Sequence, residues 1–553
     1  MSSCSAIPPE PACTAAGPAP GQGPNGPSRD TPSSGRGIAR AATVVSLGNI
    51  ASRVFGLIRD NRNAYFFGAS GSMSAFEAAS LVPKNIYELL VGGMVSAALV
   101  PVLSEYAAES KEPDELWHLV SIMLSLVTVV MGGFLLLAEV VAPLLTRLLV
   151  GGFGAQLQAL TTMLIRIISP AILFFGLSGI LTAVLYAQQV FTYPAIGAAV
   201  FNLGGILGTQ LLARRIGIAS LTLGIVLGAF LQMAVQLPGL RRARLRFSLD
   251  LRHPALRRIT VLYVPVVISL IISQIGIVLD RNLASRVGEQ AIAWMAAATR
   301  LREFPLGLVS TAVSMAVLPA LSRLDLGTGR EQFKSTLGLG LRLVLVLIVP
   351  ATVGLLVLGA PIIALIFQHG EFTFFDTSQT AQALTCYLLG TPFAAVDLLL
   401  IFAFYAQRDT RTPVIVGIVC VFIYLAVAPA LAFWMRLGMI GLVLANSVQL
   451  ASHALIMLAL LRRRVGSMAA EELADAIAKI LLSSLLMGGS VYLSLVGLRA
   501  LLPSGSLMAR AVWVAGSAVV GLLVYGFSVM RLGVREARLL AGMMRRAQHH
   551  PAA

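Results

Sequence analysis

The chain has 553 residues, of which 57% are hydrophobic and only 12% are charged, and its formal net charge is +16. A soluble protein of this length would carry roughly twice that share of charged residues, so a soluble globular fold is excluded. The apolar residues form runs of about 18 or more, which are typical of membrane-spanning helices and too continuous for barrel strands. This composition predicts an all-α polytopic membrane protein.

The first 37 residues are rich in Pro, Gly and Ser and contain no apolar core of the kind that a signal peptide has. We predict a disordered tail here and expect it to be cytoplasmic. Cys4 and Cys13 lie in this tail, and Cys386 and Cys420 lie in apolar runs. Because their spacing matches neither a disulfide framework nor a metal-binding knuckle, we expect no bound metal.

Fourteen apolar segments follow the tail, and we predict a transmembrane helix in each of them. Several exceed the ~20 residues that a bilayer requires, which implies tilt or extension beyond the membrane. The predicted helices lie at 38–66, 76–108, 117–146, 160–187, 191–213, 217–240, 258–286, 290–322, 337–367, 377–407, 412–434, 438–461, 473–500 and 508–532.

The first segment contains Arg53, Arg59 and Asp60 inside an apolar run. A charge at membrane depth costs roughly 2.5–3.5 kcal/mol on insertion scales, so it usually faces a cavity and functions there. Arg53 and Arg59 lie on different helix faces, because six residues turn a helix by roughly 240°. Asp60 is adjacent to Arg59, so we expect the two to pair only where the helix bends or a third residue intervenes.

The second segment carries Glu77, Lys84 and Glu88. Lys84 and Glu88 have the i, i+4 spacing of an intrahelical ion pair. Such a pair explains these two charges as well as a role in a cavity does.

Later apolar segments contain charges of the same kind. Asp280 lies in the seventh segment, Arg300, Arg302 and Glu303 lie in the eighth, and Asp397 stands alone in the tenth. Asp280 and Asp397 are candidates for ion coupling, and a hydrogen bond at a helix end or between helices is the competing explanation.

Taken together, the charges predict a central cavity with a net positive lining. Arginine suits phosphate because its planar guanidinium donates two parallel hydrogen bonds. We therefore expect an anionic substrate such as a phosphorylated lipid.

An internal repeat runs through the chain. Tyr-Ala-Gln occurs at 186–188 and again at 405–407, each time with a proline eight residues after the tyrosine. "VSAALVPVLS" at 95–104 matches "VSMAVLPALS" at 313–322, and a proline and a Gly-x-Phe triplet recur at the same offset of 218 or 219 residues. Two six-helix copies enter a membrane with the same orientation, and such parallel repeats typically enclose a cavity. A duplication without transport is the alternative.

The repeat divides the chain into two six-helix halves joined by a basic cytoplasmic linker and followed by two additional helices. The predicted parts are the N-terminal tail 1–37, the N-terminal half 38–240, the linker 241–257, the C-terminal half 258–463, the two extra helices within 464–532 and the cytoplasmic tail 533–553.

Basic residues are concentrated on one side of the predicted membrane. The connection 241–258 contains seven Arg, whereas the connection 502–506 contains none, and Arg214, Arg215 and Arg436 are exceptions on the poorer side. The positive-inside rule then places both termini in the cytoplasm. It accounts for much of the net charge without a nucleic-acid partner.

Catalytic motifs are missing from the sequence. It contains no GxSxG, HExxH or phosphate-binding P-loop, and its six His are scattered. No large soluble segment is present that could house an active site. We therefore predict neither an enzyme nor a bound cofactor.

Four motifs resemble the MurJ (MviN) family of lipid II flippases, in the multidrug/oligosaccharidyl-lipid/polysaccharide exporter superfamily. They are "SRVFGLIRD" in the first segment, "TRLREFPLGL" in the eighth, "FQHGEFTFFDTSQTAQAL" before the tenth and "FYAQRDTRTPV" after it. The resemblance extends from about 38 to 532 and includes the count of fourteen helices.

This resemblance implies a multi-pass protein of the bacterial cytoplasmic membrane that acts in peptidoglycan synthesis. Its substrate would be lipid II, an undecaprenyl diphosphate carrying a disaccharide-pentapeptide, moved to the outer leaflet by alternating access. The implied partners are lipid II, the bilayer and cell-wall synthesis or division proteins.

The family's cavity residues map onto this chain by motif, and the chain also departs from the family near the second segment. Ser74 stands where members carry Asp, and Tyr87 and Glu88 stand where many carry Arg. Lys84 is our candidate for a displaced cation. The residues that the resemblance implies for substrate binding are Arg53, Arg59, Asp60, Arg300 and Glu303.

Three other functions stay open. A relative could move another polyprenyl-diphosphate glycan. A cation-coupled drug antiporter of the same superfamily would favour a cavity rich in carboxylates. A non-transporting membrane partner of the division machinery would tolerate loss of the cavity charges.

Overall fold

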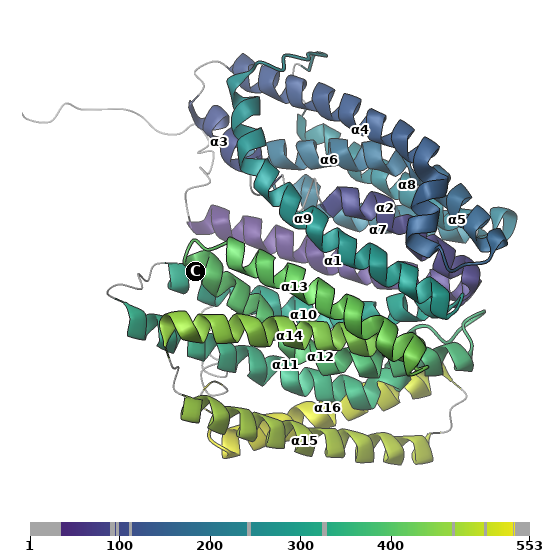
Figure 1. Cartoon of the computed structure of the whole chain (residues 1–553), viewed down its shortest axis with the longest axis vertical. Coiled ribbons are helices and arrows are strands. Elements are labelled where there is room, and N and C mark those ends of the chain that lie inside the picture. Colours follow the sequence, from purple (N-terminus) through teal and green to yellow (C-terminus); the bar gives the residue numbers. More distant parts are fainter. Residues whose placement is uncertain are drawn as a thin grey trace, which may run out of the picture.

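The computed structural model describes residues 35–88, 95, 99–109, 113–240, 245–322, 329–466, 470–502, 506–534 and 536. This described part is helical and contains no β-strand, and its helices run side by side in one bundle (Figure 1). The predicted all-α fold is confirmed. Most of the two predicted tails lies outside the described residues.

The helices follow one another with short connections. The first half of the chain forms α1 Gly35–Phe67, α2 Gly71–Tyr87, α3 Val100–Glu109, α4 Pro113–Val150, α5 Ala155–Ile168, α6 Pro170–Ala187, α7 Thr192–Ile216, α8 Ala219–Ala234 and a 3-10 turn at Leu237–Leu240. The second half forms α9 Pro254–Val287, α10 Ala291–Ser322, α11 Arg330–Ile366, α12 Phe374–Ala406, α13 Arg411–Pro429 with a π-helical end at Ala430–Trp434, and α14 Met439–Val465. The chain continues with α15 Ala470–Leu501 and α16 Leu507–Arg531.

Ten helical segments in the described part are long and apolar enough to cross a membrane. They are α4, α5 with α6, α7, α8, and each of the helices from α11 to α16. The predicted spans outside this set contain α1, α2, α9 and α10, which carry most of the charges found inside apolar segments. The multi-pass membrane fold is confirmed, whereas the count of fourteen spans stays a prediction.

Two predicted helices are each described as two. The segment predicted at 160–187 is divided at Ser169, where Pro170 opens α6 because it has no N–H for the preceding turn. The two helices together still form one apolar segment long enough to cross a membrane, as predicted for 160–187. The segment predicted at 76–108 contains α2 and α3, and residues 89–94 between them lie outside the described part.

The repeated Tyr-Ala-Gln phrase ends one helix of each half in the same way. Gln189 after α6 and Arg408 after α12 have φ values of +61° and +59°. The next amide then bonds to a carbonyl five residues earlier, at 2.8 Å for Val190 and 3.0 Å for Asp409. This is the six-to-one hydrogen bond of a Schellman helix end. The repeat therefore extends from the sequence to the backbone conformation.

Glycines bring α7 and α8 into close contact. Gly204 and Gly208 face Gly228 and Gly224, so a Cβ at either α7 position would lie 2.4 Å from the α8 backbone. Helices in membranes associate by such small-residue packing, since lipid supplies no hydrophobic driving force between them. α1 packs against α7 of this pair.

The two halves are stacked, with α1 at the boundary between them and α15 and α16 on the far side of the second half (Figure 1). We call the end of the bundle where α1 begins and α16 ends the terminal face. The other end, which holds the turns after α1, α4, α9 and α11, is the opposite face. The boundaries of the six predicted parts remain predictions.

At the opposite face the halves are in direct contact. A Cβ at Gly68 of the first half would lie 2.5 Å from the carbonyl oxygen of Glu371. The hydrogen bonds between the halves there include Glu371 N to Tyr65 O at 3.0 Å, Ala293 N to Ser74 Oγ at 3.1 Å, Gly152 N to Ser285 Oγ at 3.0 Å and Asn282 Nδ2 to Leu148 O at 2.9 Å. The opposite face is therefore closed.

The terminal face is bridged chiefly by the linker and the start of α9. Residues 245–253 are not helical, and the amides of Arg246 and Ser248 donate to serine hydroxyls of α4 at 3.1 and 3.0 Å. The side chain of Arg258 in the second turn of α9 pairs with Glu105 of α3. The linker and the first turns of α9 thus pack on the first half.

Candidate substrate-binding site

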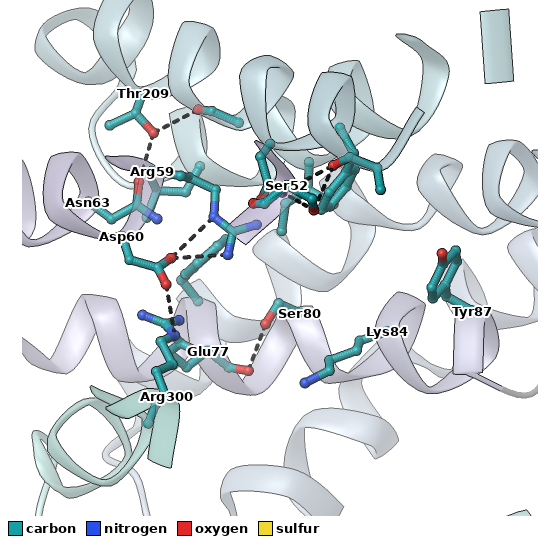
Figure 2. A pocket seen from close by; sticks show the side chains of 18 of the residues that line it. Ser52, Arg59, Asp60, Asn63, Glu77, Ser80, Lys84, Tyr87, Thr209 and Arg300 are labelled. Atoms are coloured by element: carbon teal, nitrogen blue, oxygen red, sulfur yellow. Dashed lines mark hydrogen bonds and ion pairs between the residues drawn. The ribbon is translucent and has the colours of Figure 1, made fainter. Parts of the chain in front are cut away.

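A cavity of 420 Å³, which we call the first cavity, lies between the two halves. Residues of α1, α2, α6, α7 and α8 line it from the first half, and residues of α9 and α10 line it from the second. Figure 2 shows the side chains of α1, α2, α7 and α10 that point toward one another there. Most of the charged residues of α1, α2 and α10 that lie inside apolar segments line this cavity.

Arg300 of α10 connects the halves inside the first cavity. Its Nη2 donates to Glu77 of α2, and its Nε lies 3.4 Å from a carboxylate oxygen of Asp60 on α1. The other oxygen of Asp60 accepts from Nε and Nη2 of Arg59 at 3.2 and 3.0 Å. The four side chains therefore form a row of alternating charges, Arg59–Asp60–Arg300–Glu77, along the cavity wall (Figure 2).

The direct pairing of Arg59 with Asp60 corrects the prediction that a bend or a third residue would be needed. The arginine side chain is long enough to fold back along the helix surface, so its guanidinium reaches the carboxylate of the next residue. Asp60 then still has one oxygen available for Arg300.

The support behind Arg59 comes from α7. A Cβ at Gly205 would lie 2.7 Å from Cδ of Arg59, so only glycine leaves room for the arginine stem. The guanidinium lies 6.0 Å from the ring centre of Phe201, within reach of a cation–π interaction. One turn further along α1, Asn63 accepts a hydrogen bond from the hydroxyl of Thr209 at 2.9 Å.

The charges that line the first cavity balance. The cations are Arg59, Lys84, Arg281 and Arg300, and the carboxylates are Asp60, Glu77, Glu88 and Glu303. The prediction of a net positive lining is therefore wrong. Arginines buried without counter-ions would be costly in a membrane, and the carboxylates offset that cost while no substrate is bound.

Lys84 and Glu88 do not form the intrahelical ion pair that their spacing allows, among the residues that the structure describes. Both side chains are exposed and line the first cavity. Of the two explanations left open by the sequence, their placement favours the cavity role. Lys84 is a cation without an ion-pair partner in the described part.

Arg53 and Glu303, also predicted to bind substrate, lie in different places. Glu303 lines the first cavity and a neighbouring one. Arg53 lines neither of these two cavities, and its guanidinium lies 5.7 Å from the ring centre of Phe304 on α10. Arg53 thus contributes to the contact between the halves.

The two candidate coupling carboxylates both make hydrogen bonds between helices. Asp280 lines the neighbouring cavity and accepts from the hydroxyl of Tyr424. Asp397 lies 2.6 Å from Nδ1 of His453 and lines neither of the two cavities. The described residues contain no cluster of His, Cys, Asp or Glu that could hold a metal ion.

Glu77, like Glu88 and Arg281, is a charged residue of the first cavity that our sequence-based selection left out. Glu77 lies seven residues before Lys84, which places both on one face of α2. This spacing could have identified it. Its partner Arg300 is 223 residues away, and no local pattern indicates that contact.

Comparison with known proteins gives the family. The family model described as "Lipid II flippase MurJ" matches residues 63–512. The chain belongs to the MurJ family. A Vibrio cholerae relative, named "Probable lipid II flippase MurJ", is 30% identical over 523 residues, covering 91% of this chain and 98% of that one. A Burkholderia cenocepacia "Lipid II flippase MurJ" is 29% identical over 391 residues, covering 69% of this chain and 76% of that one.

Solved structures agree with the MurJ assignment. "Lipid II flippase MurJ, inward closed conformation" matches with a TM-score of 0.74 and 26% identity, covering 88% of this chain and 98% of that chain. An inward-facing multidrug resistance MATE family transporter of the MOP superfamily matches with a TM-score of 0.58 and 14% identity, covering 77% and 95%. The second match shows a shared fold alone.

Proposed function

We propose that this chain is a lipid II flippase, which moves the headgroup across the bacterial cytoplasmic membrane without making or breaking covalent bonds. The observation that carries the proposal is the position of Arg300. In a chain of the MurJ family, a cation of the second half pairs with two carboxylates of the first half inside a cavity between them.

The diphosphate of lipid II would bind between Arg59 and Arg300. Each guanidinium can donate parallel hydrogen bonds to phosphate oxygens, which are stronger than bonds between neutral groups. Because Asp60 and Glu77 already face Nε and Nη2 of Arg300, a diphosphate that binds through this pair of donors displaces at least one carboxylate from Arg300. Binding and a change in the contact between the halves are thereby linked.

The closed opposite face supports an inward-facing starting state. We propose that both termini are cytoplasmic, as the basic connections predict, so that the opposite face points to the outer side. Substrate binding shifts the equilibrium only by its differential affinity for the two states. Opening the opposite face would separate Arg300 from Arg59 and release the headgroup outward.

The alternatives are less well supported. A drug antiporter rests only on a fold likeness at 14% identity. A flippase for another polyprenyl-diphosphate glycan would use the same two arginines, and the family match favours lipid II. We retain Asp280 and Asp397 as candidates for ion coupling, and cell-wall synthesis or division proteins as partners.

Replacing Arg59 and Arg300 by Ala together should abolish export of lipid II in cells that depend on this protein. The double variant removes the two guanidinium groups proposed to bind the diphosphate, and neither side chain belongs to the hydrophobic core. Arg300→Lys should rescue poorly, because it keeps the charge but loses the planar pair of donors. The measurement is the amount of lipid II exposed on the outer leaflet.

A matched control is Arg166→Ala, which removes an arginine of α5 that lies outside both cavities. This variant should export normally. Normal export by a stably expressed Arg59→Ala, Arg300→Ala protein would refute the proposed function of this site.

A further inference from the structure

A second cavity of 690 Å³ adjoins the first and lies mainly within the second half. Residues of α9, α10, α12, α13 and α14 line most of it, and the end of α2 closes one side. Two arginines of the second half, Arg281 on α9 and Arg302 on α10, point donors into it.

These donors are buried and have no partner. Nε and Nη1 of Arg281 and Nε of Arg302 are shielded from solvent, and none of them makes a hydrogen bond among the described residues. Buried N–H groups of a charged side chain are expensive to leave unpaired. A bound anion would remove that cost at both arginines.

Arg302 is held in place for such a ligand. Its guanidinium lies 4.9 Å from the ring centre of Tyr387, and its Nη1 donates to the side-chain oxygen of Asn446 at 3.2 Å. Stacking on one side and a hydrogen bond at one corner fix the plane of the guanidinium. Its Nε remains free to donate.

Asp280 lies close enough to Arg281 and Arg302 to attract both, and Glu88 and Glu303 also line the cavity, but none of these carboxylates forms an ion pair with either arginine in the described part. Asp280 accepts from the hydroxyl of Tyr424. The arginines therefore differ from Arg300, which holds two carboxylates.

The second cavity also presents an acceptor without a partner. The side-chain oxygen of Gln274 is buried and makes no hydrogen bond among the described residues. A phosphate group carries only acceptors near neutral pH and would leave this oxygen unsatisfied. A peptide supplies carboxylates that can accept from the two arginines and amide N–H groups that can donate to the oxygen of Gln274.

The two cavities adjoin, and a headgroup that extends past the residues lining both of them would contact both. The residues that line both are Lys84, Glu88, Arg281, Thr299 and Glu303. We propose that Arg281 and Arg302 bind a carboxylate of the pentapeptide of lipid II while Arg59 and Arg300 bind its diphosphate. This inference rests on the proposed function and assigns the peptide end of the same headgroup to the second half.

The test compares two lipid probes on the purified full-length protein. One is polyprenyl diphosphate carrying the disaccharide-pentapeptide, and the other is the same lipid without the pentapeptide. In the Arg281→Gln, Arg302→Gln variant, affinity for the complete lipid should fall about tenfold or more, as loss of charged hydrogen bonds implies. Affinity for the peptide-free lipid should change less than about twofold, since the Arg59–Arg300 pair is intact.

Two other outcomes would contradict the proposed peptide site. Equal losses with both probes would assign the second arginine pair to the diphosphate, and no loss with either would show that no ligand group binds there. If the unmodified protein binds neither probe, the proposed function itself fails. Arg166→Gln is the matched control and should bind both probes as the unmodified protein does.

A competition experiment on the unmodified protein keeps the inference testable if the double variant does not fold. The free pentapeptide should displace the complete lipid better than the same pentapeptide with all its carboxyl groups amidated. Equal competition by the two peptides would overturn the proposal. Arg302→Lys, which keeps the charge, should retain part of the preference for the free acid.

Discussion

Arg300 is the side chain on which the three charged helices α1, α2 and α10 converge. Its two carboxylate partners differ in whether each keeps another ion pair when a diphosphate displaces it from Arg300. Asp60 keeps Arg59 as a second partner, whereas Glu77 has no other ion pair in the described part of the chain. Glu77 is therefore the counter-ion that substrate displaces at the greatest cost.

Replacing Glu77 by Gln should strengthen binding of lipid diphosphate and slow transport. The affinity for lipid diphosphate should rise roughly threefold to tenfold, because the diphosphate no longer has to break a partly buried ion pair of Arg300. The displaced carboxylate would no longer be present to recapture Arg300 after release. Equilibrium binding and transport rate, measured on the same preparation, check both parts.

The control for this substitution is Glu139→Gln, which removes a carboxylate that pairs with Arg166 outside the cavities. It should change neither quantity. Weaker binding by Glu77→Gln would contradict the view that this carboxylate competes with the substrate.

At the residue scale, the sequence identified Arg59, Asp60 and Arg300 because each lies in a motif inside an apolar run. It could not give the charge balance, because that depends on which side chains of α2 face α10. Ser74 bonds to the backbone of Ala293, and Glu77 one turn later pairs with Arg300. The partners of these two side chains depend on three-dimensional contacts.

Helix ends and close helix pairs set the framework on which these side chains are placed. The ends of α6 and α12 place Gln189 and Arg408 in the left-handed region, which suits glycine better than either residue. The strain is tolerated because the turn leads directly into the next helix of each half.

Gln189→Gly and Arg408→Gly should each raise the melting temperature of the purified protein. Removing the Cβ relieves the left-handed strain, and after the entropy cost of glycine we expect a gain of about 0.5–1 kcal/mol at each position. Gln189→Ala and Arg408→Ala are the controls, since they shorten the side chain but keep the Cβ. A gain in the alanine variants equal to that in the glycine variants would show that strain is not the cause.

At the element scale, hydropathy predicted the helices well because long apolar runs leave few other structures in a bilayer. The division between α5 and α6 was signalled by Pro170, and sequence analysis still assigned one helix, since a proline also occurs within α4 and α11 without dividing them. Whether a proline bends or ends a helix depends on its neighbours in space.

The molecule consists of two repeated halves followed by α15 and α16, and the two halves are in direct contact at the opposite face. The repeat follows from the sequence, because the offset of 218 or 219 residues is nearly constant, and the parallel orientation is predicted because each copy contains an even number of predicted helices. Which end is closed does not follow from it. That depends on contacts between distant turns, such as Glu371 with Tyr65 and Ser285 with Gly152.

Opening of the closed opposite face is the movement that alternating access requires, and a reversible cross-link there tests it most directly. A Cβ at Gly71 of α2 would lie 3.4 Å from the Cβ of Glu289, which stands between α9 and α10, close to the separation found in disulfides. Neither residue lines the two cavities. Gly71→Cys and Glu289→Cys, in a background with the natural cysteines replaced, would lock the two halves together.

The decisive measurement is lipid II translocation by this double-cysteine protein in proteoliposomes, first oxidised and then reduced, with the cysteine-free parent as control. We predict that oxidation stops translocation, that reductant restores it, and that the parent is unaffected by either. Undiminished translocation by protein shown to be fully cross-linked would contradict alternating access through the opposite face.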